Sequence, residues 1–279
     1  GAVDFLMWVV TGISTGLTQG FSIQLSQYYG AKDFENLRKS LAHSYRLTAF
    51  IAVGVFILSQ SFAALVLTGL HTPSNIIGMS LLYLRIIFCG IPATAAYNMF
   101  ASALRAMGNS KTPLTAMIIA SVLNVSLDIL FVAGFGWGVA GAAIATVIAQ
   151  SFSAVYCFLI LRRIDIVHLT RADFMPAPGM NARLMKLGIP VVFQNIIIGV
   201  GGLVVQYVIN GYGFLFVAGF TATNKLYGLL EMAAISYGYA IVTYVGQNLG
   251  AEKIDRIRKG VRSSMLLSLL TSLIISAAM

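Results

Sequence analysis

The sequence predicts an all-α polytopic membrane protein with two six-helix lobes related by a parallel internal repeat. Three observations predict this fold class. Hydrophobic residues make up 58% of the 279 residues and charged residues only 10%, whereas a soluble domain carries about 25% charged residues. The apolar residues come in long, nearly uninterrupted runs, and two short stretches of sequence recur at a constant separation along the chain.

The apolar runs are long enough to cross a bilayer as helices. A hydrocarbon core about 30 Å thick requires about 20 apolar residues per helix, and eight runs meet or approach this length. The short alternating segments of a membrane barrel are not found. We therefore predict about eight spanning helices, at residues 3–28, 44–70, 79–104, 114–134, 139–161, 187–210, 214–248 and 264–279.

The ends of the chain, its two cysteines and its three histidines bear on which class of protein this is. The chain begins without Met inside one apolar run and ends inside another, so we expect a fragment, with no signal peptide to recognise. Cys89 and Cys157 lie within apolar runs and predict neither a disulfide framework nor a redox motif. The three histidines are scattered over separate connections, and no dedicated metal site or enzymatic activity is expected.

Most of the basic residues behind the net charge of +9 lie on one predicted side of the membrane. Lys and Arg concentrate in alternate connections, and the connections at 71–78, 134–138 and 211–213 hold none. The positive-inside rule places the basic connections in the cytoplasm of a cell-membrane protein. The charge predicts contact with anionic membrane lipid, and no nucleic-acid partner. The basic connections contain Lys32, Arg38, Lys39, Arg105, Lys111, Arg162, Arg163, Arg171, Arg183, Lys186, Lys253, Arg256, Arg258, Lys259 and Arg262.

An internal duplication underlies the predicted lobes. Residues 27–39 and 247–259 share Gln, Gly, Ala, Arg and Lys at an offset of 220, and Ser44 recurs as Ser264. Six predicted crossings separate the two copies, an even number, so both copies face the same side of the membrane. The halves are then parallel repeats about an axis along the membrane normal.

The repeat also divides the chain. The first lobe, without its opening helix, is predicted at 1–162, and the start of a truncated second lobe at 188–279. The polar stretch 163–187 between them is predicted to be a cytoplasmic linker, because Pro176 and Pro178 would interrupt a continuous helix.

Asp128 is the strongest candidate for ion coupling. The connection 134–138 is so short that its flanking helices must form an antiparallel hairpin, in which residue numbers that sum to 274 lie at equal depth. This pairs Asp128 with Thr146 and Asn124 with Gln150. A carboxylate in apolar surroundings readily takes up a proton or a cation, because burial disfavours the unpaired charge. The alternative is that these polar groups only bond the two helices together.

Four other charged residues also lie within predicted spans and are candidates for a substrate cavity. Glu231 has Gln194 and Asn195 at about its depth on the preceding helix; the alternative is a structural ion pair with Lys225. The remaining candidates, which would line an outward vestibule, are Asp4, Arg85 and Lys225.

Several motifs resemble, in their order and spacing, those of the multidrug and toxic compound extrusion (MATE) family. They are Arg105-Ala-Met-Gly-Asn-Ser-Lys-Thr-Pro113, Asn124-Val-Ser-Leu-Asp128, residues 141–150, Gly188-Ile-Pro190 and Gly246-Gln-Asn-Leu-Gly-Ala251. The resemblance covers the whole chain. It implies a secondary antiporter of twelve helices, of which this chain would span the second to part of the ninth. We expect a monomer that exports organic cations in exchange for protons or sodium and needs no other cofactor.

The resemblance also assigns roles to residues. In DinF-type members, an Asn and an Asp four residues apart, a Thr one helix later and an Asp on the first helix bind the coupling cation. Asn124, Asp128 and Thr146 match three of these, so a sodium ion, if used, would be held there. NorM-type members carry an acid on the helix corresponding to 187–210, and this chain has none there, which favours the DinF type.

Two other functions are weighed against the antiporter. A lipid-linked oligosaccharide flippase of the same superfamily would need a cavity rich in Arg and Lys, and only Arg85 and Lys225 are available. An intramembrane hydrolase would use Ser14, within a GxSxG motif. That motif requires a strand, a tight turn and a helix, whereas here Gly12, Gly16 and Gly20 predict a helix-packing face inside an apolar run.

Overall fold

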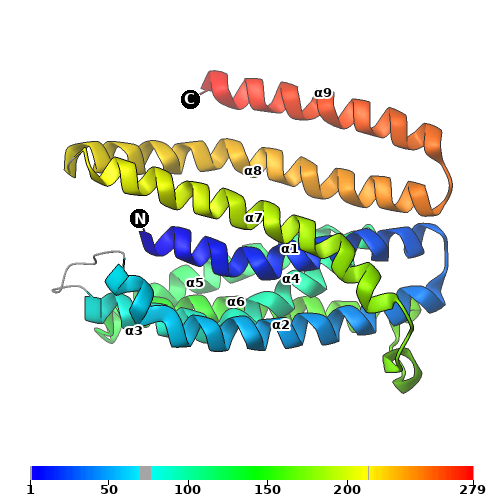
Figure 1. Cartoon of the computed structure of the whole chain (residues 1–279), viewed down its shortest axis with the longest axis horizontal. Helices are drawn as coiled ribbons and strands as arrows, with labels where there is room; N and C mark the ends of the chain where they lie inside the picture. Colours follow the sequence, from blue (N-terminus) through cyan, green and yellow to red (C-terminus); the bar gives the residue numbers. More distant parts are fainter. Residues whose placement is uncertain (1, 70–76, 213, 279) are drawn as a thin grey trace.

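The computed structural model of the chain describes residues 2–69, 77–212 and 214–278, and these form helices joined by short connections (Figure 1). The prediction of an all-helical protein is confirmed. The long helices are α1 (Ala2–Gly30), α2 (Phe34–Gly69), α3 (Ile77–Cys89), α4 (Ile91–Ala106), α5 (Lys111–Asp128), α6 (Gly138–Arg162), α7 (Met180–Asn210), α8 (Phe214–Gly250) and α9 (Ile254–Ala278). The short elements are a π-helix, η1 (Ile129–Gly134), and two 3₁₀ turns, η2 (Asp165–Val167) and η3 (Arg171–Phe174).

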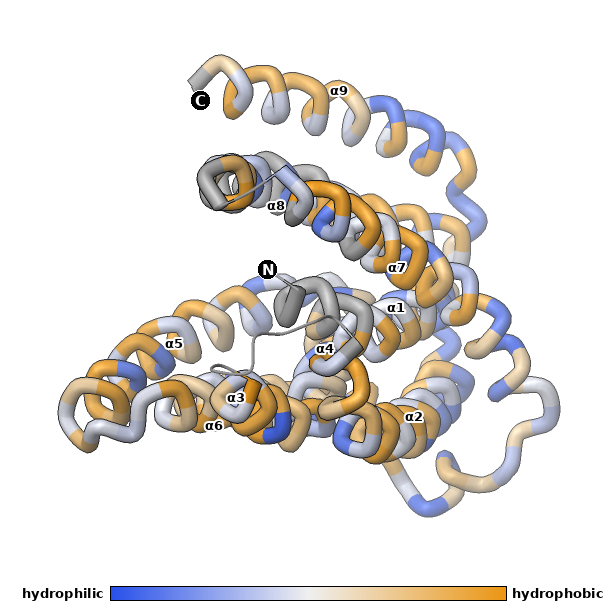
Figure 2. The backbone as a smooth tube through the Cα atoms, turned by 60° about the vertical axis from the view of Figure 1, so that its left-hand side comes forward, coloured by the Kyte–Doolittle hydropathy of each residue, from blue (hydrophilic) through white to orange (hydrophobic). Residues whose placement is uncertain are grey.

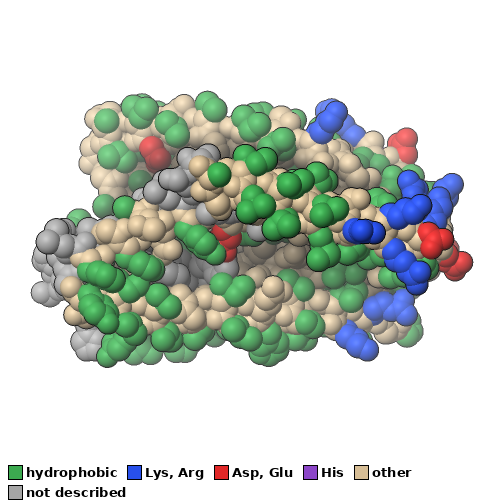
Figure 3. Space-filling model, turned by 90° about the horizontal axis from the view of Figure 1, so that it is seen from above, with side chains coloured by type: hydrophobic (Ala, Val, Ile, Leu, Met, Phe, Trp, Pro, Cys, Tyr) green, Lys and Arg blue, Asp and Glu red, His purple; other side chains and the backbone are tan. Residues whose placement is uncertain are grey.

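The helices run side by side along the long axis of the molecule. Helices α1 to α6 form one bundle, α7 packs along α1, and α9 lies outermost against α8 (Figures 1 and 2). The hydroxyl groups of Tyr237 in α8 and Thr271 in α9 are 2.8 Å apart. Lys and Arg side chains gather at the end of the molecule that holds the α1–α2 and α8–α9 connections (Figure 3). We call this the basic end.

The outer surfaces of the helices are apolar, as a lipid-facing protein requires. Phe50, Ile57 and Leu65 of α2 and Ile118 of α5 are more than half exposed. By length and composition, five helices among the described residues are able to cross a membrane, or six if a bent pair counts as one span. The five are α2, α5 with η1, α6, α7 and α9; α1 and α8, which we also predict as spans, are not among them.

The predicted span 79–104 is broken. It consists of α3 and α4, which meet at Gly90 with a bend of 42°. Pro92 lies in the first turn of α4. Its missing backbone N–H costs α4 nothing there, because the first N–H groups of a helix have no partner within it. In one continuous helix over 79–104 the same proline would remove a hydrogen bond. The apolar run alone does not reveal this break.

Three helices begin earlier than their apolar runs. Helices α2 and α9 start ten residues before the predicted spans, and α7 starts at Met180 within the predicted linker. Polar residues continue a helix where it leaves the hydrocarbon, provided that its first turn is capped. Asp33 does this for α2, because its Oδ1 accepts a hydrogen bond from the backbone N–H of Asn36 at 3.1 Å.

The two copies of the repeated sequence share one local structure. Helices α1 and α8 end at Gly30 and Gly250, and the next helices begin four residues later in both copies. Between them, Lys32 and Glu252 adopt positive φ angles of 58° and 57°. These positions are separated by the same 220 residues as the sequence repeat.

The rest of the predicted linker is ordered against α2. The ring nitrogens of His43 lie 2.7 Å from Oδ1 of Asn181 and 3.1 Å from the carbonyl oxygen of Met175. Arg46 donates to the carbonyl of Phe174 at 3.0 Å. Buried Asp173 accepts hydrogen bonds from both the N–H and the hydroxyl of Thr170. The linker therefore fixes the start of α7 relative to the first bundle.

Candidate functional site

The packing of α1 against α7 sets one wall of the central site. An added Cβ at Gly16 would lie 2.9 Å from the Cα of Val192, and one at Gly20 would lie 2.3 Å from the Cα of Gly188. Glycine is required because the two backbones approach so closely. Ser14 is buried inside this continuous helix. The prediction of a packing face is confirmed, and the strand and turn of a hydrolase elbow are absent from residues 12–16.

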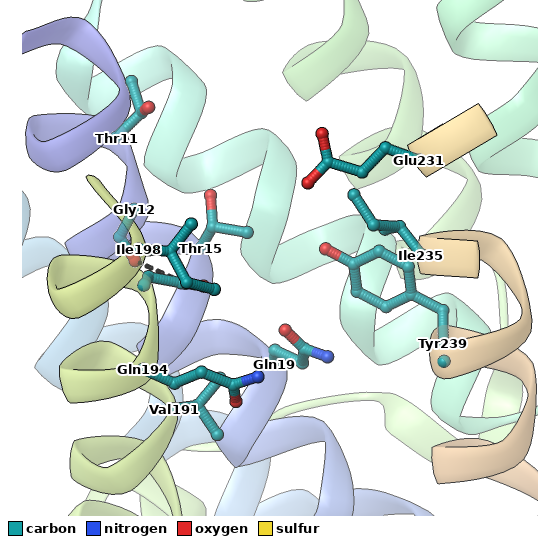
Figure 4. A pocket seen from close by; sticks show the side chains of 12 residues that line it. Thr11, Gly12, Thr15, Gln19, Val191, Gln194, Ile198, Glu231, Ile235 and Tyr239 are labelled. Atoms are coloured by element: carbon teal, nitrogen blue, oxygen red, sulfur yellow. Dashed lines mark hydrogen bonds between the residues drawn. The ribbon is translucent and has the colours of Figure 1, made fainter. Parts of the chain in front are cut away.

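A cavity of about 400 Å³ lies between α1, α7 and α8. In Figure 4, Gln19 of α1 and Glu231 and Tyr239 of α8 point into the same space. Thr15 forms part of the wall and is positioned by α4, because Nδ2 of Asn98 donates to its Oγ1 at 3.1 Å. The polar lining residues are Thr11, Thr15, Gln19, Gln194, Asn195, Glu231 and Tyr239.

The charge in this cavity is negative. Glu231 is exposed to it and is the charged residue among the described lining residues; the others offer amides and hydroxyls. Tyr239 has the guanidinium of Arg105 in α4 over its ring, 4.8 Å from the ring centroid. A carboxylate among neutral dipoles favours a cation over an anion in the cavity.

The structure brings together part of the predicted cavity set. Glu231, Gln194 and Asn195 line one cavity, although Asn195 is partly committed to structure because its Nδ2 donates to the carbonyl of Gly12 at 3.0 Å. Arg85 is exposed on α3, which packs on α2, α4 and α6, and is not among the residues that line this cavity; its place in an outward vestibule stays a prediction. The side chains of Asp4 and Lys225 lie outside the described part of the structure.

Sequence reasoning missed four polar lining residues, Thr11, Thr15, Gln19 and Tyr239. Gln19 is four residues from Thr15 on the same face of α1, and Tyr239 is eight residues, about two turns, from Glu231. These spacings are the signals from which they were predictable. The spacings indicate a shared cavity only once it is known which faces of α1 and α8 point toward each other.

A second polar site lies in the seam between α5 and α6. Nδ2 of Asn124 donates to Oγ1 of Thr146 at 3.4 Å, and Thr146 donates to the carbonyl of Ala142 at 3.0 Å. Asn124, Thr146 and Gln150 line a cavity of about 170 Å³. Oδ1 of Asp128 is buried and has no hydrogen-bond partner in the described structure. Leaving a buried carboxylate oxygen unpaired is costly, so a partner bound at this oxygen would be stabilising.

The hairpin is antiparallel, as predicted, but its register differs. Asn124 bonds to Thr146 instead of lying opposite Gln150, and Asp128 forms no hydrogen bond with Thr146. The π-helix η1, which follows Asp128 directly, contributes to this difference. Its wider turns contain more residues per turn, so Asn124 lies nearer to the connection than a count of residues implies.

The seam contains one acid among neutral polar groups. Asp128 is the carboxylate, and Asn124 and Thr146 carry an amide and a hydroxyl oxygen, the donor type that hard cations prefer. Among the described residues, no group of three or more His, Cys, Asp or Glu side chains converges. A single charge can be balanced by the one acid of the seam.

A family model decides the classification. The MatE model matches residues 1–130 and 190–279, which is most of the chain. The chain belongs to the MatE family. The match includes α1 and α8, which face each other across the central cavity, and the Asn124–Asp128 stretch of the seam.

Curated relatives agree with the MatE assignment. The chain is 28% identical to the probable multidrug resistance protein YoeA of Bacillus subtilis, over 92% of this chain and 57% of that protein. It is 31% identical to the probable multidrug resistance protein YpnP of the same organism, over 90% of this chain and 56% of that protein. The chain spans a little over half the length of these MatE relatives.

Solved structures share the fold. An outward-facing MATE transporter of the MOP superfamily superposes with a TM-score of 0.87 at 20% identity, over 98% of this chain and 61% of that one. A MOP superfamily transporter from Pyrococcus furiosus, whose binding pocket is described as having reverse polarity, superposes with a TM-score of 0.88 at 20% identity, over 99% of this chain and 62% of its own. At this identity the likeness shows the fold and leaves the site to be argued from its own residues.

Proposed function

We propose that this MatE chain forms the core of a secondary antiporter that exports organic cations in exchange for protons or sodium. The observation that carries the proposal is the central cavity, where the negative Glu231 lies among amides and hydroxyls. The protein acts in the cell membrane as a monomer, with its basic connections in the cytoplasm. Two lobes, related by the parallel repeat, expose the cavity alternately to the two sides.

Cationic substrates are supported by the chemistry of the lining. Glu231 attracts positive charge, and the apolar side chains of Val191, Ile198 and Ile235 supply contact area for an organic ion. The neutral polar groups offer hydrogen bonds in several directions, which suits varied substrates. Relatives described as multidrug resistance proteins support the same substrate class.

Ion coupling is assigned to the seam, and the arrangement is of the DinF type. Asp128 exchanges its proton or sodium ion as the lobes reorient, and Asn124 and Thr146 supply neutral ligands. Support comes from the buried, unpartnered oxygen of Asp128 and the neighbouring Asn124–Thr146 bond. The acid of the NorM type has no counterpart on α7.

An oligosaccharide flippase is the less well supported alternative. Such a cavity must hold a lipid pyrophosphate, for which Arg and Lys are the suitable side chains. The described cavity lining contains neither, and Arg85 lies elsewhere on α3.

The test is transport by the full-length protein in liposomes with proton and sodium gradients imposed separately. Tetraphenylphosphonium is a suitable organic cation, and tetraphenylborate is its control, because it has nearly the same shape and the opposite charge. We expect one of the two gradients to drive uptake or release of the cation and neither to drive the anion. Equal handling of both ions, or no response to either gradient, would contradict the proposal.

A further inference from the structure

The two copies of the repeated sequence contact each other at the basic end. An added Cβ on Gly30 of α1 would lie 1.9 Å from the carbonyl oxygen of Gln247 in α8. An added Cβ on Gly250 of α8 would lie 1.9 Å from the carbonyl oxygen of Gln27 in α1. The contact is reciprocal, because each glycine faces the glutamine three residues before the other glycine. Such an exchange is what a two-fold relation between the repeats produces.

Neither glycine tolerates a side chain in this arrangement. A Cβ essentially never approaches a backbone oxygen at 1.9 Å, and backbone atoms cannot rotate away as a side chain can. One turn earlier, a Cβ on Gly246 would lie 2.6 Å from the Cβ of Ser26. The close approach of α1 and α8 therefore extends over about one helical turn and depends on residues without side chains.

Two further contacts tie α8 to α4 beside the glycines. Nε2 of Gln247 donates to the carbonyl of Ala106, the last residue of α4, at 2.8 Å. Arg105, the preceding residue, lies over the ring of Tyr239. The end of α8 is thus attached to both α1 and α4 at the basic end.

These contacts lie directly below the central cavity. Gln19 and Tyr239 line the cavity, and each lies eleven residues before the glycine of its own helix, about 16 Å along the axis. Above this level the cavity separates α1 from α8, and at the basic end the two helices meet (Figures 1 and 4). The glycine contact therefore lies between the cavity and the basic connections.

We propose that Gly30 and Gly250 are the two halves of a gate that seals the cavity from the cytoplasm. The hydrogen bond from Gln247 to the end of α4 holds this gate closed. This rests on the proposed alternating access. The gate opens when the helix ends separate, which requires breaking the Gln247 bond but no movement of packed side chains between the glycines. Because the repeat contributes one half each, the two glycines have equivalent effects.

The first test measures the gate without any substrate. Spin labels are placed at Glu35 and Asp255, which are exposed and correspond to each other in the repeat, in full-length protein whose native cysteines are replaced. Gly30→Ala and Gly250→Ala are expected to shift the distance distribution toward the longer, separated population to a similar extent. Gly54→Ala is the control, because nothing lies within 4 Å of its added Cβ. Distributions identical to those of the parent protein in both variants would overturn the proposal.

A second test remains informative if the alanine variants fold poorly. A Ser26→Cys and Gly246→Cys pair places two thiols at the close approach, and mild oxidation should cross-link them in the closed gate. We expect oxidation to abolish transport of tetraphenylphosphonium and a reductant to restore it to the level of the unoxidised double variant, whereas oxidation leaves the transport rate of each single variant unchanged. Continued transport by fully cross-linked protein would overturn the gate. A different outcome separates the two proposals. If the parent protein does not transport the cation but Gly30→Ala still changes the spin-label distances, the proposed function is overturned and the gate is not.

Discussion

Asn124 and Thr146 join α5 to α6 through a single side-chain hydrogen bond, from Nδ2 of Asn124 to Oγ1 of Thr146 at 3.4 Å. Thr146 directs its own proton to the carbonyl of Ala142. Its hydroxyl oxygen thus accepts one hydrogen bond and donates another. The same bond also holds the hairpin together, so binding and stability must be measured separately.

Thr146→Ala removes one neutral ligand and leaves the charge of Asp128. We expect the ion concentration for half-maximal transport to rise about fivefold, since one hydrogen-bond-like interaction contributes on the order of 1 kcal/mol. Asn124→Ala should behave similarly. Ser126→Ala is the matched control on α5, because its exposed hydroxyl bonds only to the carbonyl of Val122. An unchanged ion dependence in both seam variants would assign the bond to structure alone.

Glu231→Gln keeps the size of the side chain and removes the negative charge from the cavity. We expect the affinity for tetraphenylphosphonium to fall about fivefold, because an exposed ion pair contributes up to about 1 kcal/mol. Direct binding to purified protein checks this. Glu252→Gln, exposed at the basic end, should bind normally. Equal affinities in the two variants would remove Glu231 from the substrate site.

The membrane orientation is tested by single cysteines in a background that lacks Cys89 and Cys157. Glu35→Cys and Asp255→Cys should react with an impermeant maleimide only from the cytoplasm, since both belong to the basic connections. Tyr212→Cys, exposed in the α7–α8 connection, should react only from outside. Reaction of Glu35→Cys and Asp255→Cys from opposite sides would contradict the parallel repeat.

The α1–α7 contact is expected to limit stability. Gly20→Ala places a Cβ against the backbone of Gly188, and overpacking of this kind costs about 1–3 kcal/mol. Gly201→Ala on α7 meets nothing within 4 Å and should be neutral or stabilising, because alanine favours the helix. Thermal unfolding in one detergent compares the two. Equal midpoints would show that the backbones can move apart at little cost.

Local patterns predicted much of this fold, and the misses have physical causes. The short connection 134–138 predicted the α5–α6 hairpin, but hydropathy does not distinguish the π turns of η1 from α-helix, and so the register was wrong. The apolar run 79–104 masked the bend at Gly90. The sequence repeat is matched by equivalent turns at Lys32 and Glu252. The contact between the two copies was not predictable from it, because that contact depends on how the bundles dock.

The cavity was harder to predict than the seam. Asn124 and Asp128 lie one turn apart on one helix, next to a hairpin partner, so local geometry was sufficient to group them. Gln19 and Tyr239 come from helices more than 200 residues apart. Only the docking of α7 and α8 on α1 brings their side chains to one space.

The central claim is that Asp128 carries the exchanged ion. The most direct measurement is gradient-driven efflux by full-length Asp128→Asn at matched expression, with substrate binding measured in parallel. The amide keeps the size and most hydrogen bonds of the carboxylate but neither titrates nor carries charge. We predict that substrate binding survives while gradient-driven efflux is lost, a larger effect than that of Thr146→Ala. Near-normal efflux by Asp128→Asn would show that Asp128 only bonds the helices together and would contradict this account.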